Sequence, residues 1–188
     1  MNKLCLIFVL FLIAFTSCDG RGRKHRTNAE ILTESNLLKS FSEVVKYIPE
    51  HYTEIITDTI LSNNFRIKIK YYSLNNDYVS SNNSSNEALV INHYKNFEAK
   101  IQVLNNNNII TENIINKHIF SKFENPEFWS KAIMQFIWVD YNASTKTSVN
   151  INTSFCLPET ETCKDYAITI NKFGTIQIKE INLILNTI

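Results

Sequence analysis

Apolar residues recur at the spacing of one helix face between residues 37 and 48, and charged side chains occupy the opposite face. This pattern predicts an amphipathic helix near the N-terminus. The helix should end at Ile48, because the proline at position 49 disfavours helical backbone at the residue before it.

From residue 65 the period shortens to two. Phe65, Ile67, Ile69 and Tyr71 alternate with basic residues, and a strand with one face in water is typical of an antiparallel sheet. Similar alternation or short apolar runs predict further strands at residues 55–61, 89–91, 97–104, 149–155, 166–170 and 176–183.

Four other stretches complete the expected domain. The Asn- and Ser-rich residues 75–86 predict a mobile loop, since they offer little to bury. Residues 111–123 predict a short helix, and Asn125-Pro126-Glu127 predicts the start of another that reaches about residue 132. Residues 133–139 are apolar on both faces apart from Gln135, which favours a central strand.

Together these elements predict a single β-rich domain of the α+β class over residues 34–188. Its main part should be an antiparallel sheet, either a sandwich or one curled sheet. One N-terminal amphipathic helix and one or two short helices would accompany it.

The first 18 residues follow a different pattern. Lys3 precedes the apolar run Leu4–Phe15, which at 12 residues is too short to cross a membrane, since a spanning helix needs about 20. The small residues Thr16 and Ser17 follow the run. A basic start, a short apolar run and small residues at the end are typical of a secretory signal, so we expect the domain to be exported.

The sequence Phe15-Thr16-Ser17-Cys18 resembles the lipobox of bacterial lipoproteins, although Phe15 stands where leucine is usual. In that family the cysteine is acylated and becomes the new N-terminus. The resemblance implies that residues 1–17 are a signal peptide, that Cys18 carries lipid and that residues 18–33 form a tether. The alternative is an ordinary signal peptide that is cleaved nearby.

The number of thiols favours lipidation. Cys5 leaves with the signal, so three cysteines remain and one would be unpaired unless Cys18 carries lipid. Cys156 and Cys163 flank a loop between two predicted strands, where a disulfide would be worth roughly 2 to 3 kcal/mol. Six residues separate them and no histidine is nearby, so a disulfide is favoured over a zinc site, which uses cysteines about two to four positions apart.

The balance and position of the charged residues indicate which partners to expect. Without Lys3 the chain has equal numbers of basic and acidic residues, which argues against nucleic acid as the main partner. Four cations lie between residues 21 and 26. They would press the tether onto an anionic membrane surface beside the lipid, or form a solvated linker with no lipid preference.

No catalytic motif is visible. Of three glycines only Gly174 lies in the predicted domain, which excludes phosphate-binding glycine loops and the glycine-flanked serine of hydrolases. The histidines of the domain have no partner at ligand spacing, so we expect no metal and no cofactor. The neighbouring carboxylates Glu159 and Glu161 fall in a loop, where we expect them to be solvated.

Tyr72, Trp129 and Tyr141 form a candidate binding face, because exposed aromatic rings stack on sugars and anchor protein partners. Trp138 is expected in the core. In length and layout the chain resembles the small lipoproteins of Gram-negative bacteria that carry a β-rich domain of unknown function. The leading hypothesis is a non-enzymatic lipoprotein, anchored in the cell envelope, that binds an envelope protein or glycan. The alternative is a small exported hydrolase or isomerase whose cleft the sequence does not reveal.

Overall fold

The computed structural model describes residues 26–34, 43–61, 64–84 and 89–182. The expected signal peptide, Cys18 and the cations at positions 21 to 24 lie outside these ranges. The chain divides into two compact units. The first contains helix α2 (Asn28–Glu34), and the second holds most of the strands.

Helix α2 begins with a capping box in the C-terminal part of the expected tether. The Thr27 amide donates to the Glu30 carboxylate over 2.7 Å, and the Glu30 amide donates to the Thr27 hydroxyl over 3.3 Å. This reciprocal pair satisfies amides that the first helical turn leaves without partners.

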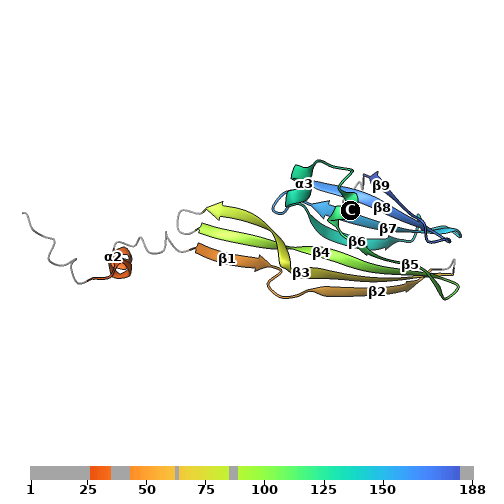
Figure 1. Ribbon diagram of the computed structural model, residues 1–188, viewed down its shortest axis with the longest axis horizontal. Helices are drawn as coiled ribbons and strands as arrows, with labels where there is room; N and C mark the ends of the chain where they lie inside the picture. The colour runs from red at the N-terminus through yellow and green to blue at the C-terminus, as the bar shows by residue number, and fades with distance from the viewer. Residues whose placement is uncertain (1–25, 35–42, 62–63, 85–88, 183–188) are drawn as a thin grey trace, which may run out of the picture. The chain divides into compact units, whose positions relative to one another are not determined.

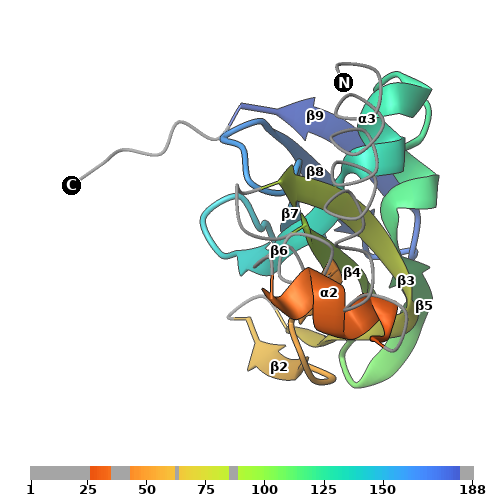
Figure 2. The same cartoon turned by 90° about the vertical axis from the view of Figure 1, so that its left-hand side faces the viewer.

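Two mainly antiparallel sheets form the β-rich part of the molecule and confirm the predicted fold class (Figures 1 and 2). The first has the order β1-β4-β3-β2, and β5 also pairs with β4. Its strands are β1 (Glu43–Ile48), β2 (Glu54–Ile60), β3 (Phe65–Ser84), β4 (Leu89–Asn105) and β5 (Asn108–Ile115). The second is a meander of β6 (Ile133–Asp140), β7 (Ser148–Cys156), β8 (Cys163–Asn171) and β9 (Ile176–Ile181).

The core joins the inner faces of the two sheets. Alternate residues of β3, β7 and β8 are buried in one apolar cluster, as the period of two predicts. The segment between the sheets adds the 3₁₀ helix η2 (Lys117–Phe120) and helix α3 (Pro126–Lys131). Phe120 and Trp129 of these helices contact Phe155 and Tyr166, with ring centroids 4.8 to 6.1 Å apart.

Local chemistry confirms several predicted elements. The Asn125 side chain accepts a hydrogen bond from the Phe128 amide at 2.8 Å and caps α3, with Pro126 in its first turn. Gly174 has φ +80° in the β8–β9 hairpin. A Cβ atom at that position would lie 2.2 Å from the Ile110 carbonyl oxygen, so only glycine fits.

The predicted helix over residues 37–48 is wrong in its second half. Residues 43–48 form strand β1, which pairs with β4, while residues 35–42 lie outside the described ranges. Val44, Val45 and Ile48 are β-branched, and such side chains favour a strand once a partner strand is available.

The predicted loop over residues 75–86 is wrong as far as the structure describes it, because β3 continues to Ser84. Polar side chains stabilise this part of the strand from neighbouring elements. The Asn96 amide donates to Asp77 over 2.7 Å, and the Ser81 hydroxyl donates to Glu159 over 2.8 Å.

The predicted helix over residues 111–123 is wrong in its first part, where residues 111–115 belong to strand β5, while residues 117–120 form the 3₁₀ helix η2. Asn106 and Asn107 have φ values of 49° and 66°, which form the tight turn of a two-residue hairpin. That turn places Asn108 opposite Asn105, so the isoleucines that follow pair with β4 as strand β5. Residues 133–139 do form a strand, but β6 is an edge strand and not a central one.

Candidate functional site

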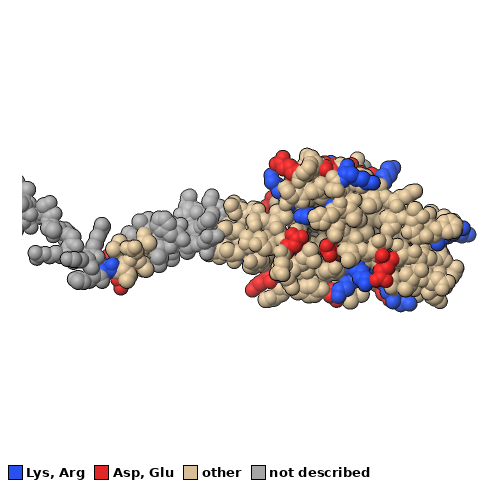
Figure 3. All heavy atoms as spheres, in the orientation of Figure 1, with Lys and Arg blue, Asp and Glu red and all other residues tan. Residues whose placement is uncertain are grey.

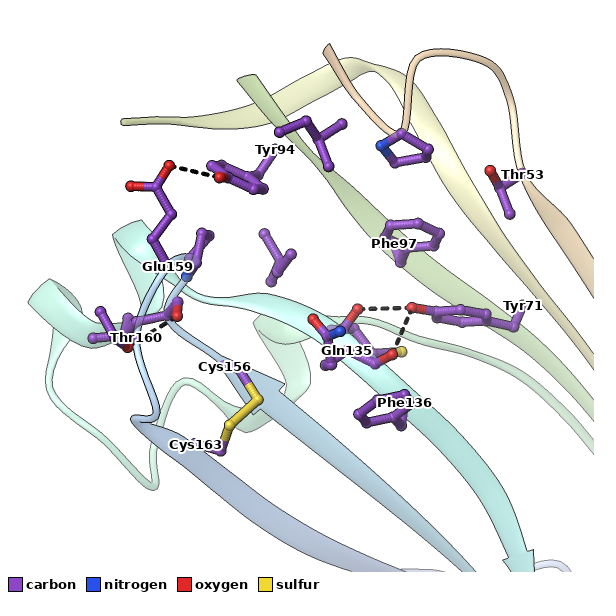
Figure 4. A pocket seen from close by; sticks show the side chains of 16 residues that line it. Thr53, Tyr71, Tyr94, Phe97, Gln135, Phe136, Cys156, Glu159, Thr160 and Cys163 are labelled. Carbon is purple, nitrogen blue, oxygen red and sulfur yellow. Dashed lines mark hydrogen bonds between the residues drawn. A yellow bond between two sulfur atoms is a disulfide. The ribbon is translucent and has the colours of Figure 1, made fainter. Parts of the chain in front are cut away.

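A cleft of about 670 Å³ lies in the second unit, within the size range of small-molecule sites (Figure 4). It is bounded by the end of β1 and the segment after it, by β3 and β4, by the start of β6 and by the loop between β7 and β8. Its lining side chains are mainly apolar or aromatic. They include Ile48, Pro49, Phe97, Phe136, Leu157 and Pro158.

Tyr71 forms the floor of the cleft with Phe97. The two rings stack with centroids 4.7 Å apart and an interplanar angle of 14°. The Tyr71 hydroxyl donates toward the carbonyl oxygens of Met134, at 2.8 Å, and Gln135, at 3.2 Å. Tyr71 is protonated at neutral pH, and burial raises its pKa above the ordinary value of 10.0, so the hydroxyl remains a donor into more alkaline solution.

The hydroxyl of Tyr71 also covers part of the edge of β6. The pairing of β6 with β7 shifts register between Met134 and Phe136, which marks a bulge around Gln135. A bulge together with capped carbonyls hinders another strand from pairing there. This end of the edge strand therefore serves as a wall of the cleft.

The loop between β7 and β8, Leu157–Thr162, forms another wall, and we call it the disulfide loop. The structure brings the predicted cysteine pair together at its neck, with the Cys156 and Cys163 sulfur atoms 2.08 Å apart, at disulfide distance. Just inside the pair, the Leu157 amide donates to the Thr162 carbonyl over 3.0 Å. The neck is thus held by both covalent and hydrogen bonds.

Glu159 at the tip of the disulfide loop contacts strands from the other sheet. Its carboxylate accepts hydrogen bonds from the Tyr94 hydroxyl at 2.6 Å, the side-chain amide of Asn92 at 2.9 Å and the Ser81 hydroxyl at 2.8 Å. Glu159 is exposed, as expected, but its carboxylate is also held by these three donors. Its partners lie 65 to 78 positions away in the sequence, so no local pattern reveals them.

Tyr94 is the titratable group among these three donors, and its pKa is shifted. Burial, followed by the hydrogen bond and negative charge of Glu159, raises the pKa of Tyr94 to about 12. The phenol therefore stays protonated, and donates to the carboxylate, to a higher pH than an ordinary tyrosine would. The Tyr94 ring lines the cleft while its hydroxyl ties the disulfide loop to β4.

The chemistry of the lining is limited. Among the described residues around the cleft, Glu159 carries the one charged side chain, and the polar groups include Thr53, Gln135 and Thr160. The described part of the lining contains no histidine or lysine, and its two cysteines are bonded to each other. Within the described ranges no three metal-ligating side chains gather. This arrangement suits binding of an apolar body with a few polar contacts.

The structure does not assemble the predicted aromatic face. Trp129 is only 7% exposed, because α3 turns it into the core against Phe120 and Phe155. Tyr72 is half-buried, and its hydroxyl donates to Glu98 over 3.2 Å. Tyr141 is 60% exposed, but the hydroxyl near it belongs to Thr59 on β2.

Trp138 was predicted to lie in the core, and that prediction is wrong. It is 37% exposed, because it lies on edge strand β6 and pairs with Asn152, on the face of the sheet that points away from the core.

Acidic and basic side chains are interspersed over the visible face of the second unit, between broad uncharged areas (Figure 3). In the part of the chain that the structure describes, no helix is long and apolar enough to cross a membrane.

No protein-family model matches the chain, and no curated protein sequence matches it.

Proposed function

We propose that the β-rich domain is a non-enzymatic binding domain that takes up a small apolar or amphipathic molecule of the cell envelope in the cleft. One observation carries this proposal: the cleft of about 670 Å³ has mainly apolar walls and a few polar groups that a ligand could reach. Burial of an apolar ligand there would gain about 25 cal/mol per Å² of apolar surface removed from water.

A small molecule fits this site better than an added peptide strand. Strand addition needs a free row of backbone donors and acceptors. At the cleft the Tyr71 hydroxyl occupies the Met134 and Gln135 carbonyls, and the β6 bulge interrupts the regular edge. The walls therefore offer apolar surface more than backbone hydrogen bonds.

The alternative, an exported hydrolase or isomerase, has less support. Acid and base catalysis needs a titratable group within reach of the substrate and free to exchange a proton. Glu159 is the carboxylate at this cleft, and three donors from β3 and β4 already hold it. Its arrangement supports a structural role.

We further propose that the domain is held at the bacterial envelope by lipid on Cys18, with the basic residues after it near the membrane surface. The lipobox-like sequence before Cys18 and the thiol count support this proposal. Radiolabelled palmitate should enter the wild type and not Cys18→Ala. Equal labelling of the two proteins would refute lipidation at that position.

Titration with the neutral dye N-phenyl-1-naphthylamine tests the cleft. The dye should bind the wild type saturably, with a rise in its fluorescence. Thr53→Trp should weaken binding at least about tenfold, a loss of about 1.4 kcal/mol in binding free energy. The reason is that the larger side chain would fill space at the wall of the cleft. Thr147→Trp, at an exposed site outside the lining, is the matched control. Unsaturable binding, or equal affinity in the two variants, would count against the proposal.

A further inference from the structure

The disulfide loop is built as a unit with one fixed end. Its neck is closed by the Cys156–Cys163 pair and by the hydrogen bond between the Leu157 amide and the Thr162 carbonyl. Within the loop, the Thr160 hydroxyl donates to the Leu157 carbonyl over 3.0 Å. These bonds hold the neck, and the tip of the loop depends on further contacts.

At the other end of the loop, side-chain hydrogen bonds tie the tip to the first sheet. Glu159 reaches across to Ser81 on β3 and to Asn92 and Tyr94 on β4, which belong to the first sheet. Hydrogen bonds to a carboxylate are among the stronger kind in proteins. Because Glu159 is exposed to solvent, water can replace these bonds when they break. The contact is therefore suited to reversible opening.

The backbone at Glu159 supports the same interpretation. Its φ of 62° lies in the left-handed region, which a residue with a long side chain rarely adopts. Such a conformation persists where surrounding contacts impose it. Loss of the three hydrogen bonds would allow Glu159 to relax, and the loop tip would move with it.

Movement of this tip would change the cleft directly. Leu157, Pro158 and Thr160 line the cleft beside Glu159, and the Tyr94 ring lines it from the opposite side (Figure 4). The Glu159–Tyr94 hydrogen bond thus joins two walls of the same space.

We propose that Glu159 is a latch that holds the disulfide loop over the cleft, and that its release from Tyr94, Asn92 and Ser81 is the step that admits and releases the ligand. This inference rests on the proposed function for the identity of the cleft as a binding site. The latch itself is a property of the loop and can be measured without a ligand.

Hydrogen exchange followed by mass spectrometry, on the full chain without ligand, tests the latch. Glu159→Ala should speed exchange of the amides in residues 157–162 by about tenfold, as expected for loss of charge-assisted hydrogen bonds. Exchange in β7 and β8 should stay as in the wild type. Glu161→Ala removes an exposed carboxylate from the same loop and should match the wild type. Unchanged loop exchange in Glu159→Ala would overturn the proposal.

Two further variants keep the test decisive if Glu159→Ala folds poorly. Tyr94→Phe removes one donor and leaves the carboxylate, so it should speed loop exchange by a smaller factor. Glu159→Gln keeps one acceptor oxygen and should recover part of the wild-type protection. Wild-type exchange in Tyr94→Phe together with full loss in Glu159→Gln would refute a latch formed by these hydrogen bonds.

Stopped-flow dissociation of N-phenyl-1-naphthylamine gives the second readout. Faster dissociation by about tenfold in Glu159→Ala, with Glu161→Ala unchanged, is expected if the latch controls ligand release. If the dye does not bind the wild type at the cleft, the proposed function fails while the exchange result still decides the latch. If the dye binds but dissociates equally fast from all three proteins, the cleft binds ligand and the latch does not control it.

Discussion

Replacement of both bonded cysteines, Cys156→Ser with Cys163→Ser, should destabilise the domain mainly through the unfolded chain. The two residues lie seven positions apart, so the bond closes a short loop. For a loop of that length the chain-entropy relation gives about 2.5 kcal/mol at 25 °C. In a domain of this size that corresponds to a fall in Tm of about 5 to 10 °C.

The folded state should change little, because other contacts hold the disulfide loop. The Leu157–Thr162 backbone hydrogen bond and the three hydrogen bonds of Glu159 do not depend on the sulfur atoms. Urea unfolding should therefore show a lower free energy of unfolding with an unchanged circular dichroism spectrum. The slope with urea should rise, because the unfolded chain without the cross-link exposes more surface.

Reductant provides the matched control for this prediction. It should lower the free energy of unfolding of the wild type to that of the double variant and leave the variant unchanged. Equal stability of wild type and variant under oxidising conditions would refute the entropic reasoning. A loss above about 5 kcal/mol would show that the bond maintains the folded state itself, since that exceeds the range for a short loop.

Three further predictions concern aromatic residues. The Tyr166 hydroxyl is buried and has no hydrogen-bond partner among the described residues, so Tyr166→Phe should raise the free energy of unfolding in urea by about 1 kcal/mol; a decrease would contradict this. Trp138 is exposed and Trp129 is buried, so Trp138→Phe should remove most of the tryptophan emission that acrylamide quenches; persistent quenching would place Trp129 at the surface. The pKa of Tyr94 is raised from 10.0 to about 12, so the folded state retains a proton that the unfolded state loses in this range. Urea unfolding should therefore show the free energy of unfolding falling as the pH rises from 10.0 to about 12. Tyr94→Phe should make this fall less steep, and an equally steep fall in the variant and the wild type would contradict the prediction.

Elements with strong local signals were predictable from the sequence. Both β7 and β8 lie where the alternating pattern puts them; β8 alternates between buried and partly exposed residues, while β7 is also buried on its polar face at Asn152 and Ser154. Asn125 and Pro126 specify the start of α3 through a cap and a fixed φ. The cysteine pair follows from two such strands joined by one loop.

Elements that depend on distant partners were not predictable. The isoleucines of β5 fit a helix or a strand, and the tight turn at Asn106 and Asn107 decides between them. Trp129 and Trp138 both stand in or near apolar stretches, and their burial follows from positions on α3 and on an edge strand. In the local sequence Glu159 looks like a solvated loop carboxylate. Its hydrogen-bond partners come from β3 and β4, far away in the chain, so the local pattern does not reveal them.

Photolabelling with a neutral alkyl diazirine tests the central claim most directly, since it reports both binding and its location. Labelled peptides should contain Phe97 and Leu157 of the cleft, and excess unlabelled alkyl compound should suppress the labelling. Phe173, which is 79% exposed outside the lining, serves as the internal control for labelling of exposed apolar surface. Competed labelling at the cleft that Thr53→Trp abolishes is the predicted result. Labelling that is strongest at Phe173, or that no competitor reduces, would contradict a binding function for the cleft.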